Sequence, residues 1–428
     1  MIKNKYSLYK PSGVNWIGDI PENWNTLKLK YEYKIQKGRI PKTISEKMDE
    51  GLVPYLSMEV LRGSDTSSFV SNDDGVFVNE GQTLILWDGS NSGEIIKVEK
   101  DGILSSTMGV LNKIGNKLNE DFSFYQLKSH EPEIRNNTNG MGIPHVDGQY
   151  VRGLVLLTPP LQEQEQIVKY LDEKTTLIDK LISTKEKKIE LLKEQRISLI
   201  NEVITKGLNP NVKMKYSGVE WIGDIPENWS ISKFKFDTKT PVQYGLNISG
   251  EKYKEEGIRF VRITDLSENG ELILENGKYL DEYEVPKEFL LKKYDVLFCR
   301  SGHTVGKSYL HLQDGEFTSG GYLVRFNFED YFKSKLIFYV SKTKFYWDWI
   351  KLNSVVSTIE NVNGDKYQNF QYPKPPSKEQ QEIVEYLDKH TKEIDDLVSL
   401  EQKKIELLKE YRQSLISEVI TGKIKVVE

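Results

Sequence analysis

The chain has 428 residues, with 59 lysines and arginines against 64 aspartates and glutamates, a formal net charge of −5. A hydrophobic content of 38% excludes a disordered chain, and no apolar run approaches the roughly 20 residues that cross a bilayer. The single cysteine, Cys299, excludes an intramolecular disulfide and a cysteine-rich zinc site. Because residues 1–10 contain no apolar leader, we expect a cytoplasmic protein that does not contact a membrane.

The chain carries one sequence plan twice. The opening motif SGVNWIGDIPENW at residues 12–24 returns at 217–229 with a single change, Asn15 to Glu220. Two long blocks, 159–208 and 375–424, also match closely. The segments between them look largely unrelated, so the pattern indicates a duplication with divergent centres.

We therefore predict two variable bodies, each followed by a shared helical block. The predicted parts are 1–158 (first body), 159–208 (first long helix), 209–374 (second body) and 375–428 (second long helix and tail). Counted by segment, the first body has 18 basic and 20 acidic residues, and the second has 23 of each. Neither body is a basic block, so we expect modest attraction to phosphates from this chain alone.

The bodies contain short apolar stretches bounded by glycine, which are typical of strands. Helical pieces are predicted near 121–128 and 331–351, so each body is expected to be α+β. The predicted strands are Thr83–Trp87, Gly153–Leu157, Ile258–Arg262 and Asp295–Phe298.

A faint likeness between the bodies survives. Residues 51–56 can be laid on 257–262, and 84–93 on 297–306. The second alignment superposes two pairs of glycines, Gly89 with Gly302 and Gly93 with Gly306. This is what one scaffold with different surface residues would look like.

The shared blocks predict long helices with a coiled-coil seam, because apolar residues recur at alternating spacings of four and three. Two copies most simply associate about a two-fold axis, which makes the helices antiparallel, although packing of each helix on its own body is the alternative. Ser377 and Gln380 predict a capping box, and Gly207 and Gly422 predict helix ends. The predicted seam residues are Leu171, Thr175, Ile178, Ile182, Ile189, Leu192, Leu199 and Val203, then Leu387, Thr391, Ile394, Val398, Ile405, Leu408, Leu415 and Val419.

Four charged residues, Lys185, Arg196, Glu401 and Arg412, interrupt this seam. Buried charges are costly unless they are paired. Two interpretations remain for them: they fix the register of the helices, or they face another subunit.

No catalytic constellation emerges from the sequence. The five histidines have no metal-ligand spacing, and Cys299 has no base near it in sequence. Residues 301–308 (SGHTVGKS) resemble a phosphate-binding loop, but Ser301 stands where that motif requires its first glycine. We interpret this segment as a surface loop.

Several motifs together resemble the specificity subunits of type I restriction–modification systems. These are the opening motif, GLVPYLSMEVLRG (51–63), LWDGSNSGE (86–94), ILSSTMGVL (103–111), PPLQEQEQIVKYLD (159–172) and its copy PPSKEQQEIVEYLD (375–388). The resemblance covers the whole chain and the order of its parts. The second body departs from it, with LFCRSGHTVGK in place of the LWDGSNSGE stretch, which puts in doubt only which bases are read.

The resemblance implies a non-enzymatic subunit with no cofactor of its own. Its two bodies would be target-recognition domains, each reading half of an asymmetric bipartite site in double-stranded DNA. The helices would set the spacing and dock two modification subunits, which carry S-adenosylmethionine chemistry. Restriction subunits, which use ATP and Mg²⁺, would complete the assembly.

Base readout requires polar side chains that reach base edges, with basic groups on phosphates. On this ground we predict DNA contacts in both bodies, with Arg62 and Arg262 favoured because each follows a strand-like run. The candidates in the first body are Lys37, Arg39, Lys42, Arg62, Ser90 and Asn91, and those in the second are Gln243, Tyr244, Arg262, Arg300, His303 and Lys307.

Two other functions are alternatives to DNA recognition. A bivalent coiled-coil adaptor, whose bodies bind proteins or glycans, fits divergent bodies equally well on physical grounds. A self-sufficient nuclease or methyltransferase is the weakest hypothesis, because the motifs that it requires are missing.

Overall fold

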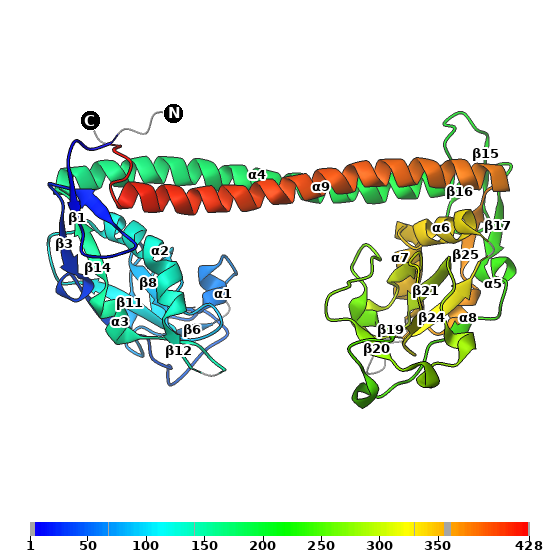
Figure 1. Cartoon of the computed structure of the whole chain (residues 1–428), viewed down its shortest axis with the longest axis horizontal. Helices are drawn as coiled ribbons and strands as arrows, with labels where there is room; N and C mark the ends of the chain where they lie inside the picture. The colour runs from blue at the N-terminus through cyan, green and yellow to red at the C-terminus, as the bar shows by residue number, and fades with distance from the viewer. Residues whose placement is uncertain (1–4, 67, 141, 329, 355–360, 427–428) are drawn as a thin grey trace. The chain divides into compact units, whose positions relative to one another are not determined.

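A computed structural model describes residues 5–66, 68–140, 142–328, 330–354 and 361–426. Its contacts divide the chain into two units: residues 1–185 with 403–428, and residues 186–402. Each unit contains one variable body, a segment of helix α4 (Leu161–Lys206) and a segment of helix α9 (Ser377–Ile420) (Figure 1). This division cuts both helices, so the boundaries predicted between bodies and helices stay predictions.

The body of the first unit is built from two four-stranded sheets. One is antiparallel throughout, in the order β4 (Tyr33–Lys37), β11 (Met108–Lys113), β8 (Thr83–Leu86) and β9 (Ile95–Lys97). The other has the order β6 (Phe69–Ser71), β5 (Leu52–Leu56), β10 (Gly102–Leu104) and β7 (Phe77–Val78), with β5 and β10 parallel. Helices α1 (Met58–Leu61), α2 (Glu120–Asn136) and α3 (Gly148–Gly153) complete it.

The body of the second unit has the same arrangement, except that its second sheet has three strands. Its antiparallel sheet has the order β18 (Gln243–Tyr244), β24 (Leu323–Asn327), β21 (Asp295–Cys299) and β22 (Ser308–Leu310). Its smaller sheet has the order β20 (Lys278–Leu280), β19 (Ile258–Val261) and β23 (Phe317–Ser319), with β19 and β23 parallel. The predicted helix at 331–351 is two helices, α6 (Tyr331–Val340) and α7 (Lys344–Asn353).

Two small antiparallel pairs recur in both units, and the first unit has one more, β12 (Thr138–Asn139) with β13 (His145–Val146). One joins the strands of the opening motif, β1 (Tyr9–Pro11) with β2 (Asp19–Pro21) and β15 (Met214–Tyr216) with β16 (Asp224–Pro226). The other closes the body, β3 (Asn25–Lys28) with β14 (Val155–Thr158) and β17 (Ser230–Lys233) with β25 (Gln371–Lys374). The strand predicted at 153–157 therefore begins later, because residue 153 ends α3.

The topology confirms that the two bodies share one scaffold. Strand β5 corresponds to β19 and strand β8 to β21, as the two weak sequence alignments indicated. The first alignment is wrong by one residue, because Leu56 pairs with Leu104 as Val261 pairs with Ser319, which places Ser57 and not Leu56 opposite Arg262. The aligned glycines all have positive φ, with Gly89 at 114°, Gly302 at 70°, Gly93 at 92° and Gly306 at 88°. This left-handed backbone favours glycine, which explains why these residues persist where the other side chains have diverged.

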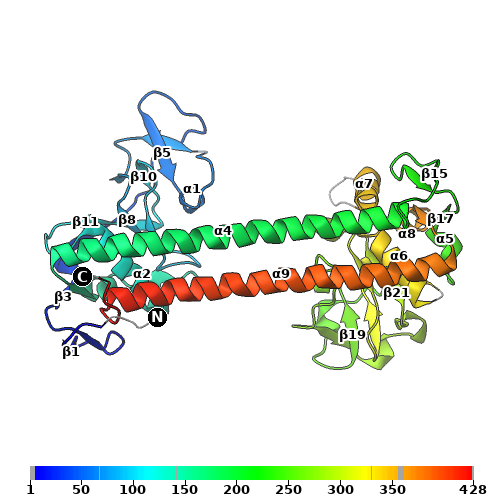
Figure 2. The same ribbon diagram turned by 90° about the horizontal axis from the view of Figure 1, so that it is seen from above.

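The predicted seam between α4 and α9 is confirmed within each unit, where the two helices run antiparallel side by side (Figure 2). Most of the predicted seam residues are buried, and Leu199, Val398 and Leu408 are half-buried. Gly207 and Gly422 end the helices with φ of 74° and 72°. The predicted capping box is wrong: the Gln380 amide donates to the Pro375 carbonyl at 2.7 Å, and Ser377 is the first residue of α9.

Three charged residues of the seam, Arg412, Arg196 and Glu401, are ion-paired. In the first unit Arg412 donates to Asp179 at 2.9 Å, and in the second Arg196 lies 2.9 Å from Asp395. Glu401, almost fully buried, lies 2.9 Å from Lys188. Both arginine pairs join corresponding positions of the duplicated block, so these charges specify the antiparallel register.

A tyrosine from each body is hydrogen-bonded to the helix that follows it. Tyr125 of α2 donates its hydroxyl to Asp172 at 2.6 Å and lies 3.2 Å from the Thr175 hydroxyl. In the second unit Tyr339 of α6 repeats both contacts, with Asp388 at 2.6 Å and Thr391 at 3.2 Å. The aspartate and threonine belong to the shared block, whereas the tyrosines come from the divergent bodies. We call this contact the tyrosine latch.

We predict that Tyr125→Phe lowers the stability of the first unit by about 0.5–1.5 kcal/mol, because the exposed Asp172 carboxylate loses a donor while the buried ring stays in place. Calorimetry should show a fall in melting temperature of about 2–4 °C per kcal/mol. Tyr31→Phe is the matched control, since that ring is 63% exposed in the same unit. Equal shifts for the two variants would contradict the latch.

Candidate nucleic-acid interface

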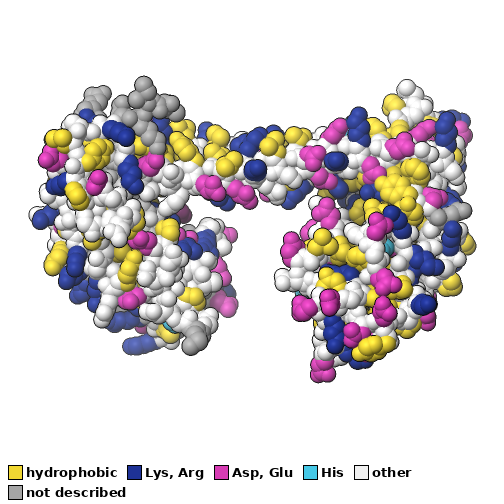
Figure 3. Space-filling model, in the orientation of Figure 1, with side chains coloured by type: hydrophobic (Ala, Val, Ile, Leu, Met, Phe, Trp, Pro, Cys, Tyr) yellow, Lys and Arg dark blue, Asp and Glu magenta, His cyan; other side chains and the backbone are white. Residues whose placement is uncertain are grey.

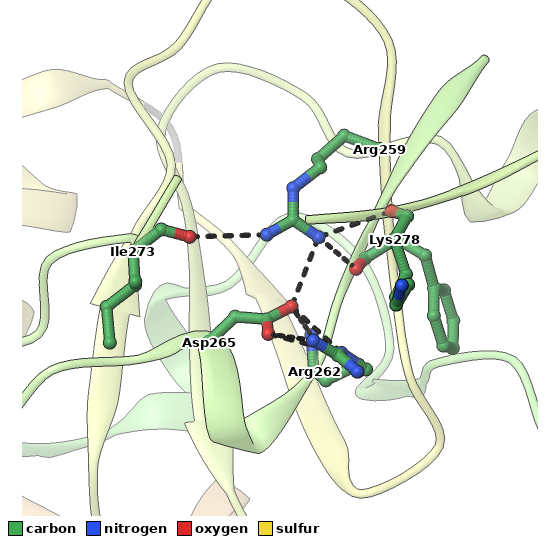
Figure 4. A network of polar contacts seen from close by, with 6 residues as sticks. Arg259, Arg262, Asp265, Ile273 and Lys278 are labelled. Atoms are coloured by element: carbon green, nitrogen blue, oxygen red, sulfur yellow. Dashed lines mark hydrogen bonds and ion pairs between the residues drawn. The ribbon is translucent and has the colours of Figure 1, made fainter. Parts of the chain in front are cut away.

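The second body carries an arginine whose orientation is fixed by an aspartate. Arg262 directly follows strand β19, and its Nε and Nη2 donate to Asp265 at 3.1 and 2.6 Å (Figure 4). The backbone N–H of Arg262 also donates to Asp265 at 3.0 Å, which closes a short turn. Asp265 is 4% exposed, and the buried Arg259 donates to it at 3.1 Å. One carboxylate is thus held between two guanidinium groups.

Arg259 connects this network to the backbone of the body. Its Nη1 also donates to the carbonyls of Phe260 and Lys278, and its Nη2 to the carbonyl of Ile273 (Figure 4). A buried arginine with this many partners is immobile, so it holds Asp265 in place. Two guanidinium groups and one carboxylate leave one net positive charge, which the partly exposed Arg262 presents to solvent.

Arg262 lies on the rim of a cavity of about 650 Å³. Arg262 is the sole charged side chain among the described residues that line it. Tyr322, which is 59% exposed, provides an aromatic ring at the same cavity, and Asn247 provides an amide. The other lining residues are Leu246, Ile248, Ser249, Tyr253, Phe260, Ile263, Thr264, Gly320 and Gly321.

Three other predicted contacts of the second body lie close together. The guanidinium of Arg300 stacks 4.9 Å from the Tyr244 ring, and Gln243 precedes that tyrosine in strand β18. The side-chain amide oxygen (Oε1) of Gln243 accepts a hydrogen bond from the buried Arg325, so this oxygen already has a partner within the body. Arg300 with Tyr244 forms a planar surface on which a base can stack.

The remaining two candidates differ in accessibility. His303 is exposed in the loop after β21. Lys307 is only 14% exposed in its side chain and lies 2.5 Å from Glu268, so it is not a free cation. The loop that contains these two residues is followed by strand β22. A phosphate-binding loop is followed by a helix, so this segment does not have the structure of one.

In the first body the predicted basic residues fall into separate places. Lys37 lies 3.0 Å from Asp88, whose other oxygen is 2.7 Å from His145, and its ammonium lies 5.7 Å from the Trp87 ring. Partial burial opposes ionisation of Asp88, but hydrogen bonds from His145 and Lys37 keep its pKa below the usual value. Lys37 is therefore held in an ordered cluster that no spacing in the sequence indicated.

The other candidates of the first body are more open. Arg39 and Lys42 are exposed in the loop after β4, and Ser90 and Asn91 lie in the turn after β8. Arg62 is 48% exposed and donates to Glu94 at 2.5 Å.

Arg62 and Arg262 do not occupy corresponding places. Arg262 is the residue immediately after β19, whereas the residue immediately after β5 is Ser57, and Arg62 comes at the end of α1. Ser57 accepts a hydrogen bond from the Val60 N–H and caps α1. The first body therefore has no arginine at the position that Arg262 occupies in the second.

The sequence reasoning missed Asp265, Arg259, Asn247 and Tyr322. Asp265 had a detectable signal, since a carboxylate three residues after an arginine that ends a strand can cap the following turn and orient that arginine. Asn247 and Tyr322 come from separate segments, and only the fold brings them to the same cavity.

The cysteine and two of the histidines are buried, and their pKa values are shifted accordingly. Burial raises the pKa of the Cys299 thiol to about 12, and burial lowers the pKa of His130 and of His311 to about 4. No group of three or more histidine, cysteine or acidic side chains that could hold a metal occurs in the part of the chain that the structure describes. Within the same residues, no helix is long and apolar enough to cross a membrane.

Charge on the surface agrees with the composition. In Figure 3 acidic and basic side chains are interspersed over the visible face of the second body, and basic side chains gather along the lower rim of the first body. Neither visible face carries one sign of charge alone.

The chain belongs to the family of type I restriction–modification specificity subunits. The model of the type I restriction modification DNA specificity domain matches it twice, at residues 21–192 and 240–409. The two matches follow the internal duplication, each covering most of one body and the helix after it.

Two curated relatives and one solved structure agree with this assignment. The MjaVIII specificity subunit of Methanocaldococcus jannaschii is 30% identical over 95% of this chain and 94% of its own length. The MjaIX specificity subunit of the same organism is 20% identical over 96% of each. A chain solved in a study of complex assembly and conformational transition of the type I R-M system has a TM-score of 0.70 at 16% identity, over 94% of this chain and 98% of that one, which supports the fold.

We predict that Cys299 does not react with a thiol reagent in the native protein, because its side chain is 0% exposed and its pKa is about 12. As it is the one cysteine of the chain, a colour-forming disulfide reagent should titrate no thiol in native protein and one per chain in denaturant. Rapid labelling of the native protein at neutral pH would contradict its assignment as a buried strand residue.

Proposed function

We propose that this protein is the DNA sequence-specificity subunit of a type I restriction–modification complex, with no catalytic activity of its own. Each body reads one half of an asymmetric bipartite site. The observation that carries this proposal is that two bodies with one topology present different polar groups. The second offers the fixed Arg262 beside a cavity, and the first offers the Lys37 cluster at Asp88.

The two long helices set the distance between the half-sites and dock the modification subunits. Within the seam pattern, residues that directly follow a seam residue face the body, as Asp172 and Asp388 do through the tyrosine latch. Residues that directly precede a seam residue face the other way. Several exposed leucines occupy such positions, Leu177 among them. Four of them are related by the duplication: Leu181, Leu191, Leu397 and Leu407, at 49, 55, 43 and 54% exposure.

These leucines form two equivalent pairs, one in each unit. Leu181 and Leu407 belong to the first unit, and Leu191 and Leu397 to the second. The duplication relates Leu181 to Leu397 and Leu191 to Leu407. An apolar pair on two adjacent helices is suited to a helix of a partner protein. Two equivalent pairs fit two copies of the modification subunit.

The chemistry belongs to the partner subunits in this proposal. The modification subunits supply S-adenosylmethionine, and restriction subunits supply ATP and Mg²⁺. The near-balanced charge of each body supports a division in which this chain selects the sequence and its partners add affinity for the DNA backbone.

Exchange of residues 25–158 for the corresponding body of another specificity subunit should change one half of the modified DNA motif and leave the other half unchanged. Methylation mapping of DNA from cells that carry the chain with its modification subunit measures this directly. A change in both halves would refute independent reading. If no modified motif appears despite an active modification subunit, a bivalent adaptor for proteins or glycans becomes the better hypothesis.

The double variant Leu181→Glu with Leu397→Glu should weaken association with the modification subunit by at least about 10-fold, because each charge would be desolvated against an apolar partner. Association is measured by analytical ultracentrifugation of the mixed subunits, and thermal melting checks the fold. The matched control is Lys187→Glu with Lys403→Glu, which alters exposed equivalent positions on another face of the helices. Unimpaired assembly of the leucine variant, or equal impairment of the control, would overturn this docking surface.

A further inference from the structure

We propose that Arg262 reads a guanine in the half-site of the second body, with Asp265 and Arg259 as its positioning residues. This inference rests on the proposed function and adds to it a specific base and the residue that selects it.

The hydrogen bonds of Arg262 leave one edge of its guanidinium available. A planar guanidinium has a side edge, formed by Nε and Nη2, and a far edge, formed by Nη1 and Nη2. Asp265 accepts from the side edge, at 3.1 Å from Nε and 2.6 Å from Nη2. Among the described residues, none accepts a hydrogen bond from Nη1 of Arg262. The far edge therefore retains two parallel N–H donors.

Two parallel donors match one base edge in the major groove. Guanine presents N7 and O6 side by side as acceptors, whereas adenine presents an acceptor beside a donor. A fork with donors only is therefore complementary to guanine and opposed by the amino group of adenine. Each well-formed pair of this kind discriminates by roughly 1–3 kcal/mol against the wrong base.

The fork is fixed before any ligand arrives. Asp265 is buried, receives the backbone N–H of Arg262, and is held by Arg259, which is itself bonded to three carbonyl groups. A free arginine loses rotamer entropy when it binds, and this one has already lost it on folding. A fixed fork also tolerates little error in the position of its acceptor, which favours a base at a defined site over a phosphate.

The surroundings of Arg262 favour a base over a phosphate as well. No second cation lines the 650 Å³ cavity within the described residues, whereas phosphate sites usually gather several donors or charges. Tyr322 and Asn247 lie at the same cavity and offer a ring and an amide to a neighbouring nucleotide. The side chain of Arg262 is still 29% exposed, so its far edge can be approached from outside.

The corresponding place in the first body carries no such reader. Ser57 follows β5 where Arg262 follows β19, and its hydroxyl is engaged in capping α1. The guanine contact is therefore specific to one half-site. This contributes to the asymmetry of the target.

The test uses the complex of the full chain with its modification subunit. Methylation mapping first gives the wild-type motif, and exchange of the first body shows which half belongs to the second. Each guanine of that half is then replaced, one at a time, by 7-deazaguanine in a synthetic duplex. The analogue keeps base pairing but removes the N7 acceptor. One position should lower the affinity of the wild-type complex by about 10-fold.

Arg262→Lys keeps the charge and removes the fork. It should lower affinity for the wild-type motif by about 10- to 100-fold, relax the choice of base at that one position, and abolish the effect of 7-deazaguanine there. Lys293→Gln, which removes a half-exposed charge from the same body, is the matched control and should leave the 7-deazaguanine effect intact.

Asp265→Asn tests the positioning role. It should reduce the 7-deazaguanine effect at the same position without altering the other half of the motif, and thermal melting checks that the variant is folded.

Three results would overturn the inference while leaving the proposed function in place. These are a second half-site without guanine, an Arg262→Lys variant with unchanged motif and affinity, and a uniform loss of affinity in that variant with the 7-deazaguanine effect retained, which would indicate a phosphate contact. Absence of any modified motif with the wild-type complex would overturn the proposed function and this inference together.

Discussion

The structure depends on the seam between antiparallel segments of α4 and α9, which recurs in both units. Leu171 and Leu387, fully buried, show how closely the apolar positions are packed. The arginine–aspartate pairs, Arg412 with Asp179 and Arg196 with Asp395, specify which turn of one helix meets which turn of the other. Because a coiled-coil seam occupies only one stripe of each helix, the seam also determines what the remaining faces can do.

One of these remaining faces is committed to the bodies. The tyrosine latch takes its aspartate from the position directly after a seam residue, so the seam geometry and the attachment of the body are coupled. The aspartate and threonine of the latch lie in the shared block, and each body supplies a tyrosine to them; in the second unit Tyr331 also donates to Asp388, at 2.7 Å. A body can thus diverge over most of its surface and remain attached in the same way.

Divergence within a fixed scaffold is what the proposed reading of two different half-sites requires. The paired sheets, the glycines with positive φ and the close approach of Gly38 and Gly245 to a neighbouring strand recur in both bodies. The residue that directly follows the corresponding strands does not recur, being Ser57 in one body and Arg262 in the other. The Ser57 side chain caps helix α1, whereas the Arg262 side chain is held by the buried Asp265 and remains partly exposed to solvent. A single position on a common scaffold is enough to change which acceptor groups a body can satisfy.

The sequence by itself determined the duplication, the two long helices and their seam, the α+β character of the bodies and the lack of a recognisable catalytic motif. These features are periodic or repeated, and therefore readable along the chain. Only the tertiary structure decided the register of the helices, the partners of Tyr125 and Tyr339, the commitment of Lys307 to Glu268, and the network of Arg259, Asp265 and Arg262. Each of these pairings depends on side chains that converge through turns and loops whose geometry no local pattern specifies. For the same reason, Arg62 and Arg262 look alike along the sequence but occupy different places in the fold. Arg62 donates to Glu94 through Nη2 alone, whereas Asp265 accepts from both Nε and Nη2 of Arg262 and so fixes one edge of that guanidinium.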